Sequence, residues 1–268
     1  MTLRAAIATP EGKRRYVRQL FATIADRYDF ITGFLSYGQD RRWKRRLIQR
    51  ARVTREDRVL DLACGTGDLL FAAMGARPAR AVGLDVTFRM LQLARTREID
   101  QARSPSLDSR SGRPERSRRP KPEARSPSRR AAWITGDMTV LPFADATFSL
   151  ITTGYGLRNV PDLDRTLAET HRVLAPGGRL LSLDFNRPRN AIVRTAYLIY
   201  LTIVGSALGL ALHGDPDTYR YIPESIRNYP GAHGVARMME QRGFVDVQVI
   251  PVLLGFMAIH VARKPLTD

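Results

Sequence analysis

Residues 59–68 decide the fold, and they read Val59-Leu60-Asp61-Leu62-Ala63-Cys64-Gly65-Thr66-Gly67-Asp68. An apolar run ends in an acid, small residues and two glycines follow, and a helix-like apolar pattern then covers residues 69–73. This pattern predicts a buried strand that turns sharply into a helix. Gly65 and Gly67 lack a Cβ, so the backbone can adopt positive φ and approach a ligand closely. Because the helix N-terminus beside the loop offers free N–H groups, the stretch predicts a nucleotide-like ligand.

Two ligand classes compete for this loop. A dinucleotide fingerprint requires a third glycine where this chain has Leu70. S-adenosylmethionine (SAM) carries a sulfonium cation and no phosphate, so Asp61 and Asp68 suit it and would repel a pyrophosphate. Asp85, at the end of the next short strand, can hold ribose hydroxyls in either ligand. The loop favours SAM and leaves the dinucleotide open.

From residue 58 onward the pattern alternates between strands and helices, which implies a parallel sheet with right-handed crossovers. Strands are expected at 58–62, 80–84, 131–135, 147–153 and 179–185, and helices at 68–75, 88–97, 163–174 and 232–242. Two further strands at 245–250 and 257–262 read as an antiparallel hairpin. The predicted fold is α/β, a Rossmann-like class I SAM-dependent methyltransferase with a mostly parallel sheet and a C-terminal antiparallel hairpin.

Residues 1–57 are expected to form a helical cap that belongs to the same domain. A helix is predicted over 13–27, then a loop containing Gly33 and Gly38, then a second helix over 40–52. Arg and Lys side chains crowd one side of the second helix. That side is either a solvated face or a surface for anionic lipid headgroups.

The net charge of +17 comes almost entirely from two segments: residues 1–58 contribute +9 and residues 103–130 contribute +7. Of the 28 residues in the second segment, 22 are Arg, Lys, Ser or Pro. Such a composition cannot bury enough surface to offset its ordering entropy. We therefore predict a disordered basic insertion at about 98–131 that interrupts a methyltransferase domain of residues 58–268.

The insertion leaves a second function open. Its Arg-Ser character would suit an RNA or protein methyltransferase that holds its substrate there, although a solvated tether is favoured and nucleic acid is not the expected partner. Deletion of residues 103–130 separates the two: loss of activity would favour the rival function, and unchanged activity would leave the insertion as a tether.

Cysteine content and apolar segments limit which metal sites, disulfides and cellular locations are expected for the protein. Cys64 is the only cysteine, which excludes an intramolecular disulfide and a cysteine-rich metal site, and we predict no metal. The first residues have no apolar signal region, so a cytoplasmic enzyme is expected. Residues 195–212 are uncharged and long enough to span a membrane, but a crossing would separate strands of one sheet. A helix that lines a substrate cavity fits better, and a core helix stays open.

Short motifs along most of the chain carry a resemblance to a known family. They are Tyr28-Asp29 with Gly38, Arg42-Trp43-Lys44, the loop of 61–68, Leu141-Pro142-Phe143, Gly156-Leu157-Arg158-Asn159-Val160, Tyr219-Arg220-Tyr221, Glu224-Ser225-Ile226-Arg227 and His260. On these motifs the chain resembles the ubiquinone/menaquinone biosynthesis C-methyltransferases. That family uses SAM to methylate a ring carbon of a polyprenylated quinol.

The resemblance implies Thr66 at the methionine part of SAM, Asp85 on its ribose and Asp137-Met138 at its adenine. With the loop, the expected cofactor residues are Asp61, Gly65, Thr66, Gly67, Asp85, Asp137, Met138 and Gly154. This chain departs from the family pattern in Cys64, which replaces a glycine, in Gly154, which replaces a frequent serine, and in the basic insertion.

The resemblance also implies the reaction. Arg158 is expected to stabilise a phenolate-like charge on the quinol and Asn159 to orient the hydroxyl or a water, while a loop salt bridge is the alternative for Arg158. His213, Tyr221 and His260 are weaker candidates, His171 and His233 have no assigned role, and the general base is open.

The expected acceptor is demethylmenaquinol, with the benzoquinol step of ubiquinone biosynthesis left open. Because such an acceptor is fat-soluble, the enzyme is expected at the inner face of the cell membrane, in peripheral contact with anionic lipid. A homo-oligomer is also left open.

Overall fold

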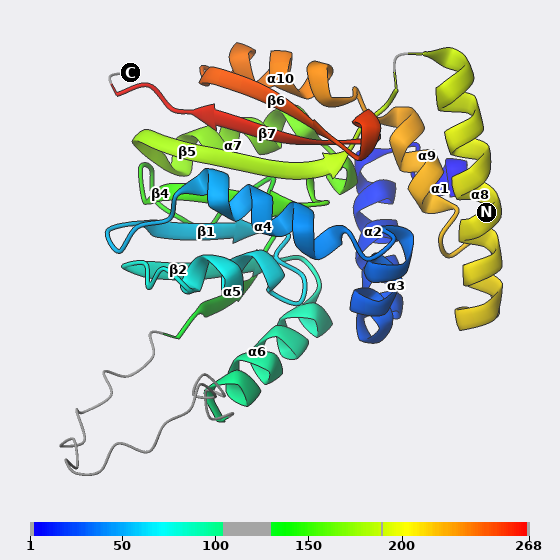
Figure 1. Cartoon of the computed structure of the whole chain (residues 1–268), viewed down its shortest axis with the longest axis horizontal. Coiled ribbons are helices and arrows are strands. Elements are labelled where there is room, and N and C mark those ends of the chain that lie inside the picture. Colours follow the sequence, from blue (N-terminus) through cyan, green and yellow to red (C-terminus); the bar gives the residue numbers. More distant parts are fainter. Residues whose placement is uncertain (1–2, 104–129, 189, 267–268) are drawn as a thin grey trace, which may run out of the picture.

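The computed structural model describes residues 3–103, 130–188 and 190–266 (Figure 1). These residues form a seven-stranded sheet of order β3-β2-β1-β4-β5-β7-β6. The strands are β1 (Arg58–Leu62), β2 (Arg80–Asp85), β3 (Ala132–Thr135), β4 (Phe148–Gly154), β5 (Leu174–Phe185), β6 (Val245–Val252) and β7 (Met257–Arg263). All pairs from β3 to β5 are parallel, and β7 is antiparallel to β5 and β6. The predicted fold class is confirmed.

Helices cover both faces of the sheet. They are α1 (Leu3–Ala6), α2 (Pro10–Ile24), α3 (Tyr28–Leu35), α4 (Asp40–Ala51), α5 (Asp68–Met74), α6 (Phe88–Arg103), α7 (Leu163–Val173), α8 (Ala191–His213), α9 (Tyr221–Asn228) and α10 (Ala232–Gln241), with short 3-10 turns η1 (Ala25–Arg27), η2 (Leu157–Asn159) and η3 (Leu253–Gly255). Successive side chains along β1 point to opposite faces of the sheet. Val59 packs under α4 and α5, whereas Leu60 and Leu62 pack with α7 and α10.

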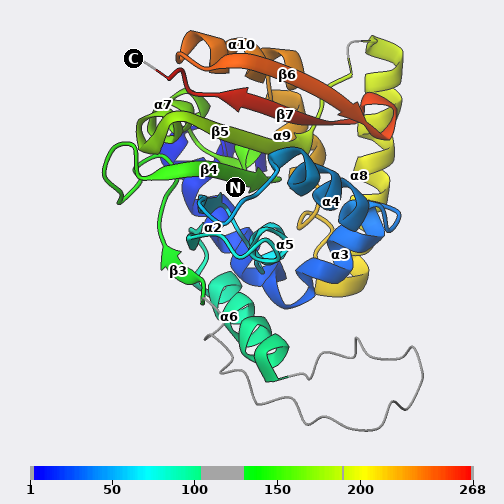
Figure 2. The same cartoon turned by 60° about the vertical axis from the view of Figure 1, so that its left-hand side comes forward.

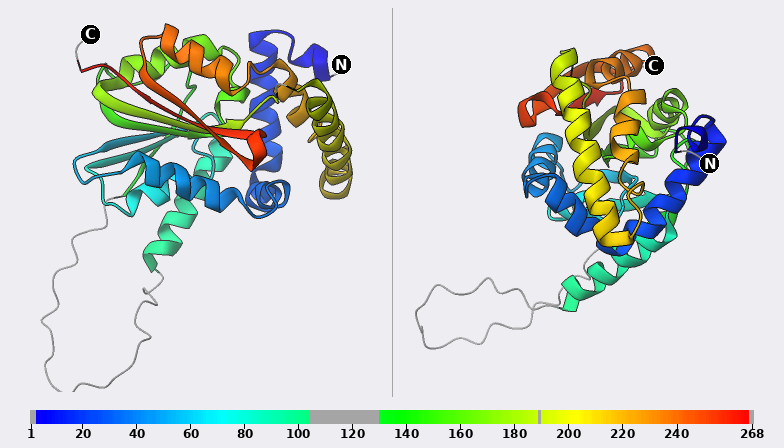
Figure 3. Two further views of the ribbon diagram at one scale, coloured as in Figure 1. Left: turned by 45° about the horizontal axis from the view of Figure 1, so that its top comes forward. Right: turned by 90° about the vertical axis from the view of Figure 1, so that its right-hand side faces the viewer.

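One end of the sheet gathers the elements that build a site. Helices α2, α3, α8 and α9 lie beyond the carboxyl ends of the parallel strands, and α8 is the outermost of them (Figures 1 and 3). Figure 2 shows β3 at the edge of the sheet beside α6. Ligands of open α/β sheets bind at this carboxyl end, so the fold places the candidate site under these helices.

The helix predicted to end at residue 97 continues to Arg103. Its extra turn is held because Glu98 accepts hydrogen bonds from the Ala131 backbone (2.7 Å) and from Nε1 of Trp133 (3.0 Å). The edges of the predicted insertion at 98–131 are therefore wrong: residues 98–103 are helical and Ala131 is held in place. The rest of that prediction falls on residues 104–129, outside the described residues.

The loop predicted around Gly33 is also wrong, because residues 28–35 form α3. Ile31 is buried there against Ile24 and Tyr219, and this long-range packing outweighs the low helix propensity of Gly33. The short helices α1 and α9 were not predicted. The strand expected at 179–185 begins earlier, at Leu174, and its pairing with β4 shifts register between Phe148 and Leu150.

Candidate active site

A cavity opens at the carboxyl ends of β1, β2 and β4, beneath α2. Six of the predicted residues line it: Gly65, Asp85, Asp137, Met138, Gly154 and Asn159. Arg14 of α2 closes one side and forms an ion pair with Asp137, in which Nε lies 2.8 Å from Oδ2. The N-terminal helix is therefore part of the cavity wall.

The glycine loop takes the conformation that its sequence predicts. Gly65 and Gly67 have φ of +53° and +89°, and Gly67 precedes the first turn of α5. A Cβ on Gly67 would lie 2.8 Å from Phe71 and from Trp133. Gly67 does not line the cavity, so its part among the predicted residues is to make the turn possible.

Two buried acids flank the loop. Asp85 accepts hydrogen bonds from the backbone N–H groups of Gly65 and Thr87, both at 2.8 Å, and burial raises its pKa. Asp61 is 1% exposed, and its Oδ1 accepts from Thr152 at 2.7 Å. Its Oδ2 has no hydrogen-bond partner among the described residues, and burial raises the pKa of Asp61 to about 7. An orphaned carboxylate oxygen suits a ligand that brings a cation and not a phosphate.

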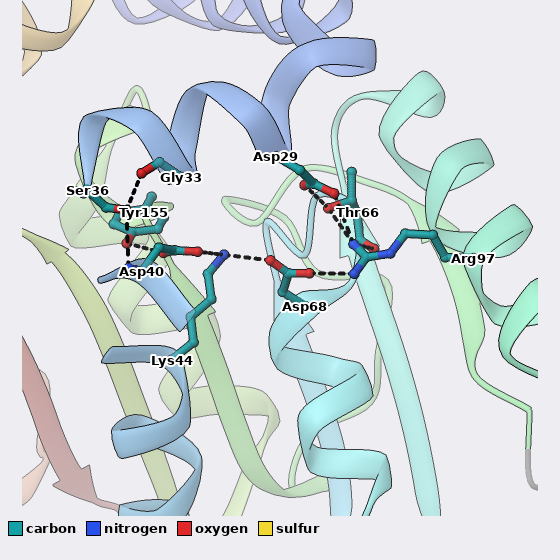
Figure 4. Close-up of polar contacts among 9 residues, drawn as sticks. All are labelled: Asp29, Gly33, Ser36, Asp40, Lys44, Thr66, Asp68, Arg97 and Tyr155. Atoms are coloured by element: carbon teal, nitrogen blue, oxygen red, sulfur yellow. Dashed lines mark hydrogen bonds and ion pairs between the residues drawn. The ribbon is translucent and has the colours of Figure 1, made fainter. Parts of the chain in front are cut away.

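Asp68 has a different role from the one that the sequence predicts. Its two oxygens are taken by Nζ of Lys44 and Nη2 of Arg97, both at 2.8 Å (Figure 4). Although burial acts to raise the pKa of Asp68, these two cations hold it below its usual value. Asp68 is thus neutralised by side chains and not kept free for a cationic ligand.

The same set of polar contacts fastens α3 and α6 to the loop. Thr66 Oγ1 donates to Asp29 Oδ1 (2.8 Å), and Arg97 Nη1 donates to the backbone oxygen and to Oγ1 of Thr66, each at 3.0 Å (Figure 4). Thr66, Lys44, Asp61 and Asp68 line a smaller pocket that adjoins the main cavity. The loop is therefore held in shape by residues from three helices.

A second cavity lies between α2, α3, α8 and α9, and its walls are mainly aliphatic and aromatic. It includes Arg158, Tyr197 and Tyr221, and it shares Phe21 and Tyr28 with the first cavity, along with Tyr155. The two cavities therefore meet across a short partition of aromatic rings. The predicted role of the 195–212 helix in lining a cavity is confirmed, since Tyr197, Tyr200 and Leu201 of α8 contribute to this wall.

Arg158 lies in η2, just after β4. Its Nε is 3.2 Å from Asp184 Oδ1, and its Nη1 donates to Ser225 Oγ (2.8 Å) and to Asn159 Oδ1 (3.2 Å). Its guanidinium lies 4.7 Å from the centre of the Phe185 ring. Arg158 therefore forms the salt bridge that was its alternative interpretation, and it also lines the second cavity, while its role toward a quinol stays a prediction.

Of the weaker candidates, the histidines make contacts outside the two cavity walls, whereas Tyr221 lines a cavity. His260 bonds Ser182 through Nδ1 and the Ala232 carbonyl through Nε2, and burial lowers its pKa to about 4. It is a satisfied core histidine away from both cavities. His213 bonds the Tyr219 hydroxyl, His171 packs edge-on against Phe244, and His233 is exposed. Tyr221 does line the second cavity.

Several site residues were missed from the sequence. Lys13 of α2 donates to the backbone oxygen of Arg158 (3.0 Å), and burial together with Arg158 lowers the pKa of Lys13 to about 8. Lys44, Arg97 and Tyr155 were likewise not assigned to the site. Lys44 could have been suspected because it stands alone among the basic residues of its helix on the apolar side, near Trp43 and Leu47.

Family and structure comparisons agree with this geometry. The model of the ubiE/COQ5 methyltransferase family matches residues 9–111 and 115–264. The chain belongs to the ubiE/COQ5 methyltransferase family. The resemblance seen in the sequence is thereby confirmed, and the enzyme is a SAM-dependent methyltransferase.

Named relatives match along nearly their whole length. The ubiquinone/menaquinone biosynthesis C-methyltransferase UbiE of Cellvibrio japonicus is 34% identical over 257 residues, covering 95% of this chain and 94% of the relative. The demethylmenaquinone methyltransferase of Thermus thermophilus is 36% identical over 247 residues, covering 92% and 100%. Both names describe enzymes of quinone biosynthesis.

Solved structures show the same fold at low identity. A SAM-dependent methyltransferase of Thermotoga maritima, described as a possible histamine N-methyltransferase, is 16% identical with a TM-score of 0.58 and covers 92% of this chain and 99% of its own. A phosphoethanolamine N-methyltransferase of Haemonchus contortus, solved with S-adenosylhomocysteine, is 13% identical with a TM-score of 0.56, covering 84% and 52%.

Proposed function

We propose that this enzyme methylates a ring carbon of a polyprenylated quinol. The preferred acceptor is demethylmenaquinol, and the alternative acceptor is a benzoquinol of ubiquinone biosynthesis. One observation carries the proposal: an apolar, aromatic cavity contains the buried guanidinium of Arg158 and adjoins the cofactor cavity. An uncharged ring with a hydrocarbon tail suits such walls, and the cation suits an ionising hydroxyl. The names of the relatives support both acceptors.

The first cavity fits SAM by its donor set. Asp85 would hold the ribose and Asp137 and Met138 the adenine, while Gly65 and Gly154 leave room for close approach. In the smaller adjoining pocket, Asp61 and Thr66 would hold the methionine part. When bound, SAM supplies the methyl group from its sulfonium. Asp61 lines the smaller pocket, and its Oδ2, which has no hydrogen-bond partner among the described residues, suits a cationic amine.

Arg158 and Asn159 prepare the acceptor. Arg158 would stabilise the negative charge that develops when a quinol hydroxyl loses its proton, which makes the neighbouring ring carbon nucleophilic. Ser225 and Asp184 fix the guanidinium, so it needs little reorganisation. Asn159 donates Nδ2 to the Tyr155 carbonyl (2.7 Å), which holds its amide beside the partition between the cavities.

Acceptor choice is tested by one assay. The protein is incubated in detergent with methyl-labelled SAM and one of two acceptors. The acceptors are demethylmenaquinol and a polyprenyl benzoquinol, each without the ring methyl group that the enzyme would add. We expect label in the naphthoquinol product, with the benzoquinol turning over more slowly. An enzyme that labels neither ring, but labels RNA or protein, contradicts the proposal.

We further propose that the enzyme works in the cytoplasm, at the inner face of the cell membrane, where such a quinol resides. By length and composition α8 could span a membrane, and only 22% of its most apolar window is buried. Ile199, Ile203 and Leu210 are exposed on it, and Leu254 of the nearby η3 turn is 99% exposed with φ of +54°. Exposed apolar groups in this number favour a lipid contact.

The rim of the second cavity belongs to the same surface. Tyr37, which follows α3, and Tyr200 of α8 both line the cavity, and their hydroxyls are hydrogen-bonded to each other. Beside them, a groove between α3 and α4 combines Phe34 with Arg41 and Arg45. Apolar side chains flanked by arginines suit a bilayer with anionic headgroups. A lipid acceptor could then reach the cavity without leaving the membrane.

The membrane contact predicts a binding defect. Changing both Ile203 and Leu254 to Asp should weaken binding to phosphatidylglycerol vesicles by at least about 100-fold, since each large aliphatic side chain contributes roughly 1.5–3 kcal/mol when it is buried. Vesicle co-sedimentation measures this. Val245→Asp, at the opposite end of the sheet, should bind like the unmodified protein. Unchanged binding, or a dimer that dissociates in the double variant, contradicts the contact.

A further inference from the structure

We propose that Lys44 binds the α-carboxylate of the methionine part of SAM. The inference depends on the cofactor alone and needs no particular acceptor. It begins from the smaller pocket at the loop, which shares Gly65, Gly154 and Tyr155 with the main cavity and extends it toward α4. A ligand that fills the main cavity can therefore continue into this pocket.

The pocket has the charge pattern of a zwitterion site. The methionine part of SAM ends in an ammonium and a carboxylate on the same carbon. The buried carboxyl group of Asp61 lines the pocket and suits the ammonium. Lys44 is the cation among the described residues that line the pocket, and it suits the carboxylate. Arg14, the cation of the main cavity, is paired with Asp137 at the other side.

The ammonium of Lys44 has a donor to spare. It carries three N–H groups. Two of these N–H groups are donated to carboxylate oxygens: Nζ lies 2.7 Å from Asp40 Oδ2 and 2.8 Å from Asp68 Oδ2 (Figure 4). Its Nζ also lies 5.6 Å from the centre of the Tyr155 ring, which itself lines both the pocket and the main cavity. The third donor can thus serve a ligand without breaking either ion pair.

The two ion pairs prepare Lys44 for that role. Although burial acts to lower the pKa of Lys44, Asp40 and Asp68 raise it above its usual value, so the group stays charged in a buried place. Asp40 also accepts a hydrogen bond from the Tyr155 hydroxyl. A cation held in this way also offsets the repulsion that Asp68 would exert on an incoming carboxylate.

The test compares two ligands on matched variants. Calorimetry measures the binding of S-adenosylhomocysteine and of its decarboxylated analogue, which keeps the amine. The unmodified protein should prefer the carboxylate-bearing ligand by about 10- to 100-fold, as expected for a buried charge-assisted hydrogen bond. In Lys44→Met this preference should disappear, with the affinity for the decarboxylated analogue kept within about 3-fold. Lys44→Arg should retain part of it.

Other outcomes overturn the assignment. If Lys44→Met weakens both ligands by the same factor, Lys44 only holds the loop in shape. If the variant keeps the full preference, the carboxylate binds elsewhere. Arg50→Met, an exposed change on the same helix, serves as the control and should bind both ligands like the unmodified protein. Since no acceptor is present, failure of the proposed quinol reaction would leave this measurement unaffected.

Discussion

Replacing Arg158 with Met should lower turnover with demethylmenaquinol by about 100- to 1,000-fold, the loss typical when one preorganised partner of a developing anion is removed. The affinity for S-adenosylhomocysteine should change by less than about 3-fold, because Arg158 lines the second cavity and not the first. Single-turnover rates and calorimetry measure the two quantities separately.

The Arg158 variant needs a folding control. Asp184 is 1% exposed and would lose its cation, and breaking a buried pair costs about 3–5 kcal/mol. The double variant Arg158→Met with Asp184→Asn removes the stranded charge and should recover thermal stability without recovering turnover. Arg158→Lys keeps the charge but not the planar fork, so partial activity is expected. A stable double variant with normal turnover would show that Arg158 is structural.

Replacing Asp85 with Asn should weaken binding of S-adenosylhomocysteine by about 100-fold. The carboxylate accepts from the N–H groups of Gly65 and Thr87, and an amide can accept from only one of them. The other N–H loses its acceptor, which costs roughly 1–3 kcal/mol, and any ligand hydroxyl loses a charged partner. Calorimetry gives the dissociation constant, and thermal unfolding gives the change in stability.

The matched control for Asp85 is Asp145→Asn. Asp145 is exposed and pairs with Arg172 away from both cavities, so its loss should leave cofactor binding unchanged. An Asp85→Asn protein that binds the ligand within about 3-fold of normal would remove Asp85 from the site. A variant that fails to fold would be followed by Asp85→Glu, which keeps both acceptors.

Local sequence patterns were enough to predict the fold of this enzyme. Strand periodicity and the two glycines of the loop depend on neighbours in the chain, so β1, α5 and a mostly parallel sheet with a C-terminal hairpin could be inferred from them. The strings around Arg158 identified the family. Patterns failed where packing outweighed propensity, as in α3, whose Ile31 is buried against residues more than 180 positions away.

The sequence by itself determined the fold, the loop at residues 61–68 and the family, because these depend on short stretches with fixed spacing. Only the tertiary structure decided how the charges are shared. Lys44 and Arg97 reach Asp68 from separate helices, and Asp184 reaches Arg158 from the neighbouring strand. The local spacing of residues does not predict these ion pairs, since they depend on how the helices pack on the sheet. That packing neutralised Asp68, left one oxygen of Asp61 without a partner and placed the Arg158 guanidinium in the wall of an apolar cavity.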